Sequence, residues 1–105
     1  MRQLKRLRVN YKVIIFAEAK ADIKEAAAWY NEKLPGLNKR FVAAIKNEIA
    51  IIQSNPFLYE IRYDEIRTAL IKDFPYLIHY DVINLTIFIK AIYHTSRNSN
   101  IWMER

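Results

Sequence analysis

Short apolar runs rich in β-branched and aromatic residues, which are typical of strands, occur at two places in the chain. Near the start, residues 11–16 (YKVIIF) place Tyr11, Val13 and Ile15 on one face, which predicts a short strand. Three further strand-like runs fill the last third of the chain: residues 66–71, 76–82 and 85–94. The breaks between these three runs are short, so we expect an antiparallel meander.

Between the strand-like regions, the apolar period changes to that of amphipathic helices. Residues 17–34 are rich in Ala, Glu and Lys and carry one apolar stripe, consisting of Ile23, Ala26, Ala27, Tyr30 and Leu34. Pro35 and Gly36 end this helix. A second apolar stripe follows, consisting of Leu37, Phe41, Ile45, Ile49 and Ile52. Because the connection between the helices is so short, they should form an antiparallel hairpin.

The resulting order is β-α-α-β-β-β in one α+β domain over residues 1–105. We expect the helical hairpin to pack on one face of a small antiparallel sheet. The second helix should end near Ser54, because Asn55 precedes a proline. Residues 57–65 have no clear period and are expected to be a loop that leads into a strand. In the last hairpin, Asn84 suits a turn position with positive φ.

Composition narrows the class of protein and of site. The chain has 105 residues, of which 52% are hydrophobic, enough for one buried core. It has no cysteine, which excludes disulfides and thiolate metal sites, and its two histidines are too few for a zinc site unless carboxylates take part. We therefore expect no metal and no cofactor. No apolar run approaches the ~20 residues of a membrane span, and a cytoplasmic location is expected.

The net charge of +6 is concentrated at the beginning of the chain. Five basic residues precede the first acidic residue, Glu18: Arg2, Lys5, Arg6, Arg8 and Lys12. Residues 1–10 form a basic N-terminal arm. This arm is either an ordinary solvated segment or a contributor to binding of RNA, DNA or an acidic partner.

Polar residues of the last strands could carry chemistry. Simple alternation puts Lys90 and His94 on one face of the last strand, and His79 and Asp81 on a polar side of the strand before it. Further positive charge comes from Arg67, with Arg62 and Arg97 at the ends of the strands. Such residues suit phosphate, and histidine can transfer a proton during RNA cleavage. They are equally typical of an ordinary half-exposed sheet face.

His94 stands out among these residues because it lies where the chain leaves the sheet, a common place for sites. His79, between strand residues, is more typical of a histidine bonded to a neighbour. Trp102, near the end of the chain, is expected to pack against the domain or to anchor a partner. We find no Gly-rich phosphate loop and no Ser/His/Asp arrangement.

Four stretches together carry a family resemblance. They are the "WYN…PGL…RF" helical hairpin, the "NP" end of the second helix, the "FPY.I.Y" strand and the closing "A..H..R....W". Over residues 11–102 the chain resembles the RelE/ParE superfamily of bacterial type II toxins. Its "FPY.I.Y" and "H..R" motifs resemble the ParE members of that superfamily more than the RelE members. The resemblance implies the same β-α-α-β-β-β fold and a toxin neutralised by a cognate antitoxin, in a hetero-oligomer.

The resemblance implies two possible activities. RelE-like members cleave mRNA on the ribosome, in which case His94, Arg62, Arg67 and Arg97 would be the catalytic residues. ParE-like members poison DNA gyrase, and target binding would then involve Lys90, His94, Arg97 and Trp102. A third possibility is a non-toxic remnant that only binds antitoxin. Since the middle strands lack a dense set of Lys and Arg, we favour binding of a target such as gyrase over catalysis.

Overall fold

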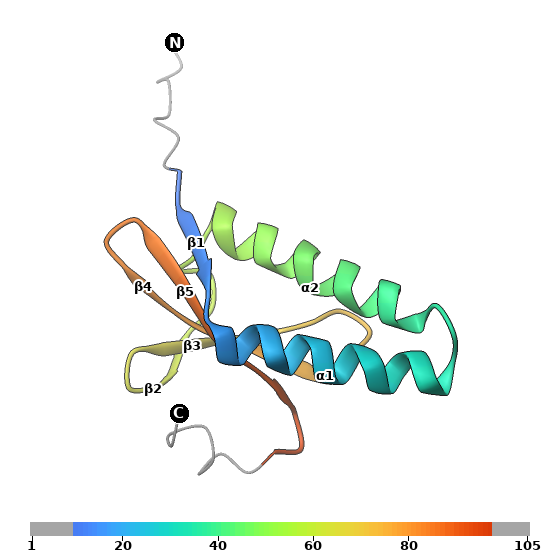
Figure 1. The fold of residues 1–105 in the computed structure, drawn as a ribbon. Coiled ribbons are helices and arrows are strands. Elements are labelled where there is room, and N and C mark those ends of the chain that lie inside the picture. Colours follow the sequence, from blue (N-terminus) through green and yellow to red (C-terminus); the bar gives the residue numbers. More distant parts are fainter. Residues whose placement is uncertain (1–9, 98–105) are drawn as a thin grey trace, which may run out of the picture.

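The computed structural model describes residues 10–97, so most of the basic arm and Trp102 lie outside the described residues. Two helices and five strands follow one another in the order β1-α1-α2-β2-β3-β4-β5 (Figure 1). Their bounds are β1 Lys12–Ile15, α1 Ala17–Lys33, α2 Leu37–Ser54, β2 Ile61–Tyr63, β3 Ile66–Leu70, β4 Tyr76–Ile83 and β5 Thr86–His94. The α+β class and the expected bounds of both helices are confirmed.

The helices form an antiparallel hairpin on one face of the sheet, as expected (Figure 1). Gly36 permits the tight connection because its φ is 93°, and its N–H is bound by the Asn31 side chain at 3.2 Å. Tyr30 of α1 packs against Phe41 of α2, with ring centroids 5.1 Å apart, and against Phe74 at 5.0 Å. These aromatic contacts join the hairpin to the sheet in one core.

The sheet is mixed rather than wholly antiparallel. Its strand order is β1-β5-β4-β3-β2, and β1 pairs in parallel with β5, from Lys12 opposite Thr86 to Ile15 opposite Ile89. The expected meander of β3, β4 and β5 is antiparallel, as predicted. Hydrophobic period reports which residues share a face but carries no information on strand direction, so the parallel pairing could not be deduced from it.

A short strand also occupies part of the segment that was expected to be a loop. β2, at Ile61–Tyr63, pairs antiparallel with β3, and Asp64 makes the turn between them with φ of 49°. The pairing has a register shift within its three residues, which explains why this segment shows no clean alternation.

A bulge in β5 overturns the predicted faces of that strand. His79 pairs with Ala91 and Tyr80 with Ile89, so Lys90 is an extra residue without a partner on β4. The core-facing residues are consequently Ile87, Ile89 and then Ile92, in place of an unbroken alternation. The prediction that Lys90 and His94 share one face is therefore wrong.

Candidate functional site

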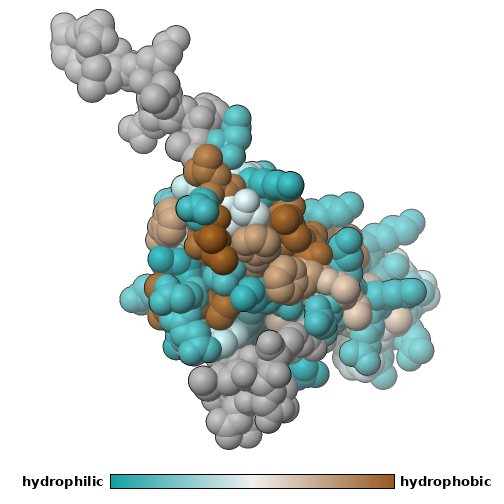
Figure 2. Space-filling model, turned by 60° about the vertical axis from the view of Figure 1, so that its left-hand side comes forward, coloured by the Kyte–Doolittle hydropathy of each residue, from teal (hydrophilic) through white to brown (hydrophobic). Residues whose placement is uncertain are grey.

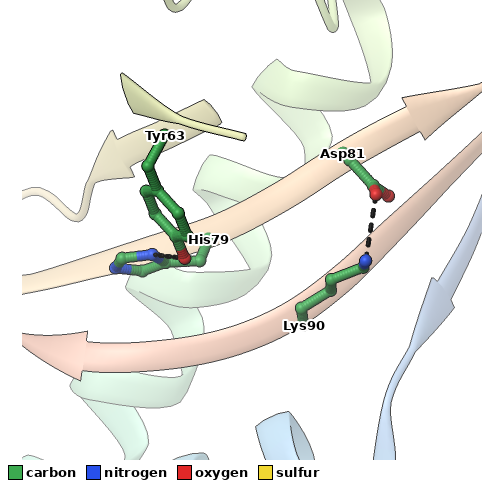
Figure 3. A network of polar contacts seen from close by, with 4 residues as sticks. All are labelled: Tyr63, His79, Asp81 and Lys90. Atoms are coloured by element: carbon green, nitrogen blue, oxygen red, sulfur yellow. Dashed lines mark hydrogen bonds and ion pairs between the residues drawn. The ribbon is translucent and has the colours of Figure 1, made fainter. Parts of the chain in front are cut away.

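Lys90 lies on the sheet face away from the helices, here called the outer face. Its Nζ is 3.0 Å from Oδ2 of Asp81, a carboxylate whose side chain is only 9% exposed (Figure 3). The same Nζ lies 5.8 Å from the ring centroid of Phe16. Lys90 thus neutralises a buried carboxylate, and its position on the outer face is fixed by that ion pair and by the bulge.

His79 lies on the same face and is fully buried. Its Nδ1 is 2.9 Å from the hydroxyl of Tyr63, which reaches it from β2 (Figure 3). The ring of Tyr93 makes an edge contact with His79, with centroids 5.0 Å apart. The sequence-based reading of His79 as a strand residue bonded to a neighbour agrees with this geometry.

His94 belongs to a different environment, a cavity of about 490 Å³ between α1 and the end of β5. The cavity is lined by Asp22, Glu25, Ala26, Trp29, Tyr30, Pro75, Tyr76, Ile92, His94 and Arg97. Tyr76, paired with His94 on the neighbouring strand, makes an edge contact with its ring at 5.2 Å. Sequence analysis did not identify this cavity, because half of its lining comes from a helix that was read only for its apolar stripe.

The hydrogen bonds of His94 define its tautomer. Nδ1 lies 3.0 Å from the backbone N of Ser96 and 2.8 Å from its Oγ. Since a backbone N–H can only donate, Nδ1 is an acceptor, and the neutral ring carries its proton on Nε2. In this neutral form His94 offers a hydrogen-bond donor at Nε2, while Nδ1, the nitrogen that could accept a proton, is occupied by Ser96.

The three candidate arginines serve different regions of the described chain. Arg67 donates to the carbonyl oxygen of Tyr59, and its guanidinium lies 5.1 Å from the ring centroid of Phe57, so it holds the segment before β2. Arg62 reaches Thr68 at 3.4 Å. Arg97 lies over the ring of Tyr93 at 4.8 Å and also lines the cavity. Of the four catalytic candidates, His94 and Arg97 share the described cavity lining, and Arg62 and Arg67 do not belong to it.

Asp22 is a structural residue that the sequence did not reveal. Its Oδ2 accepts a hydrogen bond from the backbone N of Ile92 at 3.0 Å. β1 pairs with β5 only as far as Ile89, and the next edge amide is satisfied by this carboxylate on α1. The contact joins α1 to β5 directly beyond the bulge.

Tyrosines near the core carry the resolved pKa shifts. A hydrogen bond to Glu48, with the hydroxyl 2.6 Å from Oε2, is the main reason that the pKa of Tyr59 rises to about 12. Burial raises the pKa of Tyr80 to about 12, and its hydroxyl donates to the Pro56 carbonyl oxygen at 2.7 Å. Burial also raises the pKa of Tyr76. These phenols are neutral donors at physiological pH.

Within residues 10–97, no group of three or more His, Asp or Glu side chains could hold a metal ion. Neither described helix has the length and apolar character needed to cross a membrane. The cavity lining and the partly exposed residues of the outer face are available to contact a ligand.

A comparison with family models matches residues 13–99 to the ParE toxin of the type II toxin–antitoxin system parDE. The chain belongs to the ParE toxin family. A search of curated proteins gave no match. This ParE-family chain is also similar to a chain in a solved structure described as the chromosomal ParDE TA system from P. aeruginosa, with a TM-score of 0.72 and 18% identity. The match covers 80% of this chain and 95% of that one, and at this identity it shows the shared fold.

Proposed function

We propose that this ParE-family toxin arrests growth by binding an essential protein target in the cytoplasm, such as DNA gyrase. The observation that carries the proposal is the separation of Lys90 from His94 by the bulge. A ribonuclease of this fold would need its basic and proton-transferring residues around one phosphate. Here Lys90, Arg62 and Arg67 are engaged at other places, which favours recognition over catalysis.

Target contacts would come from the end of β5. His94 and Arg97 share the cavity, and both present donors to a partner. Lys90, 37% exposed on the outer face, would make a separate charged contact on the opposite side of the sheet. Trp102, which lies outside the described residues, is proposed as a further anchor.

A cognate antitoxin would neutralise the toxin in a hetero-oligomer. The described surface exposes many large apolar side chains: Trp29, Leu34, Ile51, Phe57, Leu58, Ile61, Leu70, Ile83 and Leu85. Figure 2 shows brown apolar side chains interrupting the polar surface on one face. A partner that covers some of these groups and brings acidic residues to a chain of net charge +6 would fit. The structural relative described as a ParDE TA system is consistent with such a partner.

The test begins with induction of the chain alone and together with the small reading frame beside it. We expect growth arrest alone and growth with the partner. Purified toxin should then inhibit supercoiling by gyrase and leave mRNA intact in a translation reaction. Absence of growth arrest would contradict the toxin proposal and favour the non-toxic remnant.

One observation favours a second candidate, a ribosome-dependent endoribonuclease. His94 and Arg97 line the same cavity, so Arg97 could hold a phosphate while His94, once protonated to the imidazolium, gave its Nε2 proton to the leaving group and returned to the neutral ring. Cleavage of mRNA in the translation reaction, with gyrase unaffected, would establish this candidate and exclude the first.

A further inference from the structure

The cavity beside His94 has one wall made by α1. Asp22, Glu25 and Trp29 line this wall, and their spacing of three and four residues places them on one side of the helix. The opposite wall comes from Tyr76 and His94, which are paired across β4 and β5. The cavity thus combines carboxylates on a helix with aromatic rings on both sides.

The α1 wall of the cavity carries two carboxylates, Asp22 and Glu25, although the chain as a whole has a net charge of +6. Asp22 is held by the Ile92 amide, while Glu25 is exposed and forms no ion pair within residues 10–97. Burial is the main reason that the pKa of Tyr76 is raised. The negative charge of Glu25 raises this pKa further, so its electrostatic effect extends across the cavity to the opposite wall. A cationic group entering the cavity would therefore meet a carboxylate that has no other described partner.

The aromatic wall also suits a cation. Trp29 is 52% exposed, and the Nζ of Lys33 already lies 5.0 Å from the centroid of its ring. Lys33 thus makes a cation–π contact with this ring, and the face of an indole is favourable for positive charge. A guanidinium would gain more than an ammonium, since it is planar, stacks on aromatic faces and binds a carboxylate with two parallel hydrogen bonds.

The two basic residues of the described cavity lining, Arg97 and His94, are directed to other partners. The guanidinium of Arg97 lies over Tyr93, a ring that contacts His79 on the outer face, and Nδ1 of His94 is bound by Ser96. Arg97 lowers the pKa of Tyr76, so its charge is also felt in the cavity. An entering cation should accordingly bind on the α1 side, between Glu25 and Trp29.

We propose that this cavity is a receptor for an arginine side chain presented by a protein partner. The charge of Asp22 and Glu25, the aromatic rings and a volume of about 490 Å³ together match a guanidinium on a peptide segment. That this partner is the toxin's target is an inference that rests on the proposed function. Binding of arginine is independent of the proposed function, because it can be measured on the isolated protein.

The test titrates the full chain with the peptide Gly-Gly-Arg-Gly-Gly and with its citrulline analogue, which has nearly the same shape and no charge. The readout is the indole NMR signal of Trp29. We expect the arginine peptide to bind at least about tenfold more tightly, a factor equal to about 1.4 kcal/mol. Glu25→Gln should weaken binding about fivefold or more, while Glu32→Gln, on the same helix but outside the cavity lining, should leave it unchanged.

Equal binding of the two peptides, or full binding by the Glu25→Gln variant, would overturn the proposal. A variant that lacks residues 1–9 tests the source of the arginine. If this variant bound the peptide several-fold more tightly, the chain's own basic arm would be the occupant, and the assignment to a separate partner would be wrong. Loss of peptide recognition with intact growth arrest would leave the toxin function standing.

Discussion

Lys90 and His94, four residues apart on one strand, lie on opposite faces of the sheet. Because Lys90 is itself the extra residue of the β5 bulge, it pairs with Asp81 on the outer face, whereas His94 lines the cavity beside α1. The two polar groups can therefore be altered independently.

Replacing Lys90 tests the ion pair on the outer face. Lys90→Met should lower the free energy of unfolding by about 1–3 kcal/mol, because Asp81 would remain buried without its cation. Urea unfolding followed by circular dichroism measures the change. The double variant Asp81→Asn, Lys90→Met should recover part of the loss, and a double variant less stable than Lys90→Met would contradict this reading.

Replacing His94 by glutamine separates binding from proton transfer. The amide keeps a hydrogen-bond donor but cannot act as an acid near neutral pH. A binding toxin should retain its growth arrest within about threefold, whereas a ribonuclease should lose roughly 100-fold or more in cleavage rate. Circular dichroism of the variant controls for folding, and a 100-fold loss of cleavage in a folded variant would show catalysis.

The hydrogen bond from Ile92 to Asp22 should protect one amide from exchange with solvent. Asp22→Ala should destabilise the protein by about 1 kcal/mol and speed hydrogen exchange at the Ile92 amide. Glu25→Ala, one helical turn away, is the matched control and should leave that exchange rate unchanged. Equal rates in both variants would mean that Asp22 does not hold the strand edge.

Alkaline pH should weaken the fold through two phenols. Tyr59 and Tyr80 have a pKa of about 12 in the folded chain against an ordinary value of 10.0. The unfolded chain therefore releases these protons first as pH rises. The stability contributed by the neutral phenols is complete below about pH 10 and is lost between pH 10 and 12.

Urea unfolding at pH 8 and pH 11 measures this loss. The variant Tyr80→Phe should be less stable at pH 8, since it lacks the hydrogen bond to Pro56, but should show a smaller decrease on going to pH 11. An unchanged pH dependence would contradict the role of this phenol.

Helices and turns that depend only on residues within the element itself were predicted from the sequence. The apolar stripes of α1 and α2, and Gly36 between them, predicted where both helices begin and end. The turn residue Asn84 does adopt positive φ, at 56°, as its position in the last hairpin predicted. The family resemblance drawn from motifs in these elements is confirmed by the family match.

Features set by tertiary pairing could not be predicted in the same way. Nothing in the residues around Lys90 signals an extra position, because a bulge is defined by the partner strand. The same holds for Asp22, whose role depends on β1 ending early beside β5. The cavity therefore appeared only when helix and strand were placed together, and the roles assigned to its residues remain predictions.

The parallel pairing of β1 with β5 also constrains how the toxin is made. Lys12 and Thr86 are 74 positions apart, so at 5–20 residues per second roughly 4–15 s pass between their synthesis. The helical hairpin can form during that interval from neighbouring residues, but the edge strand β1 has no partner until β5 has been translated. A nascent chain that has not yet reached β5 would carry an incomplete sheet, in which β1 has no neighbour.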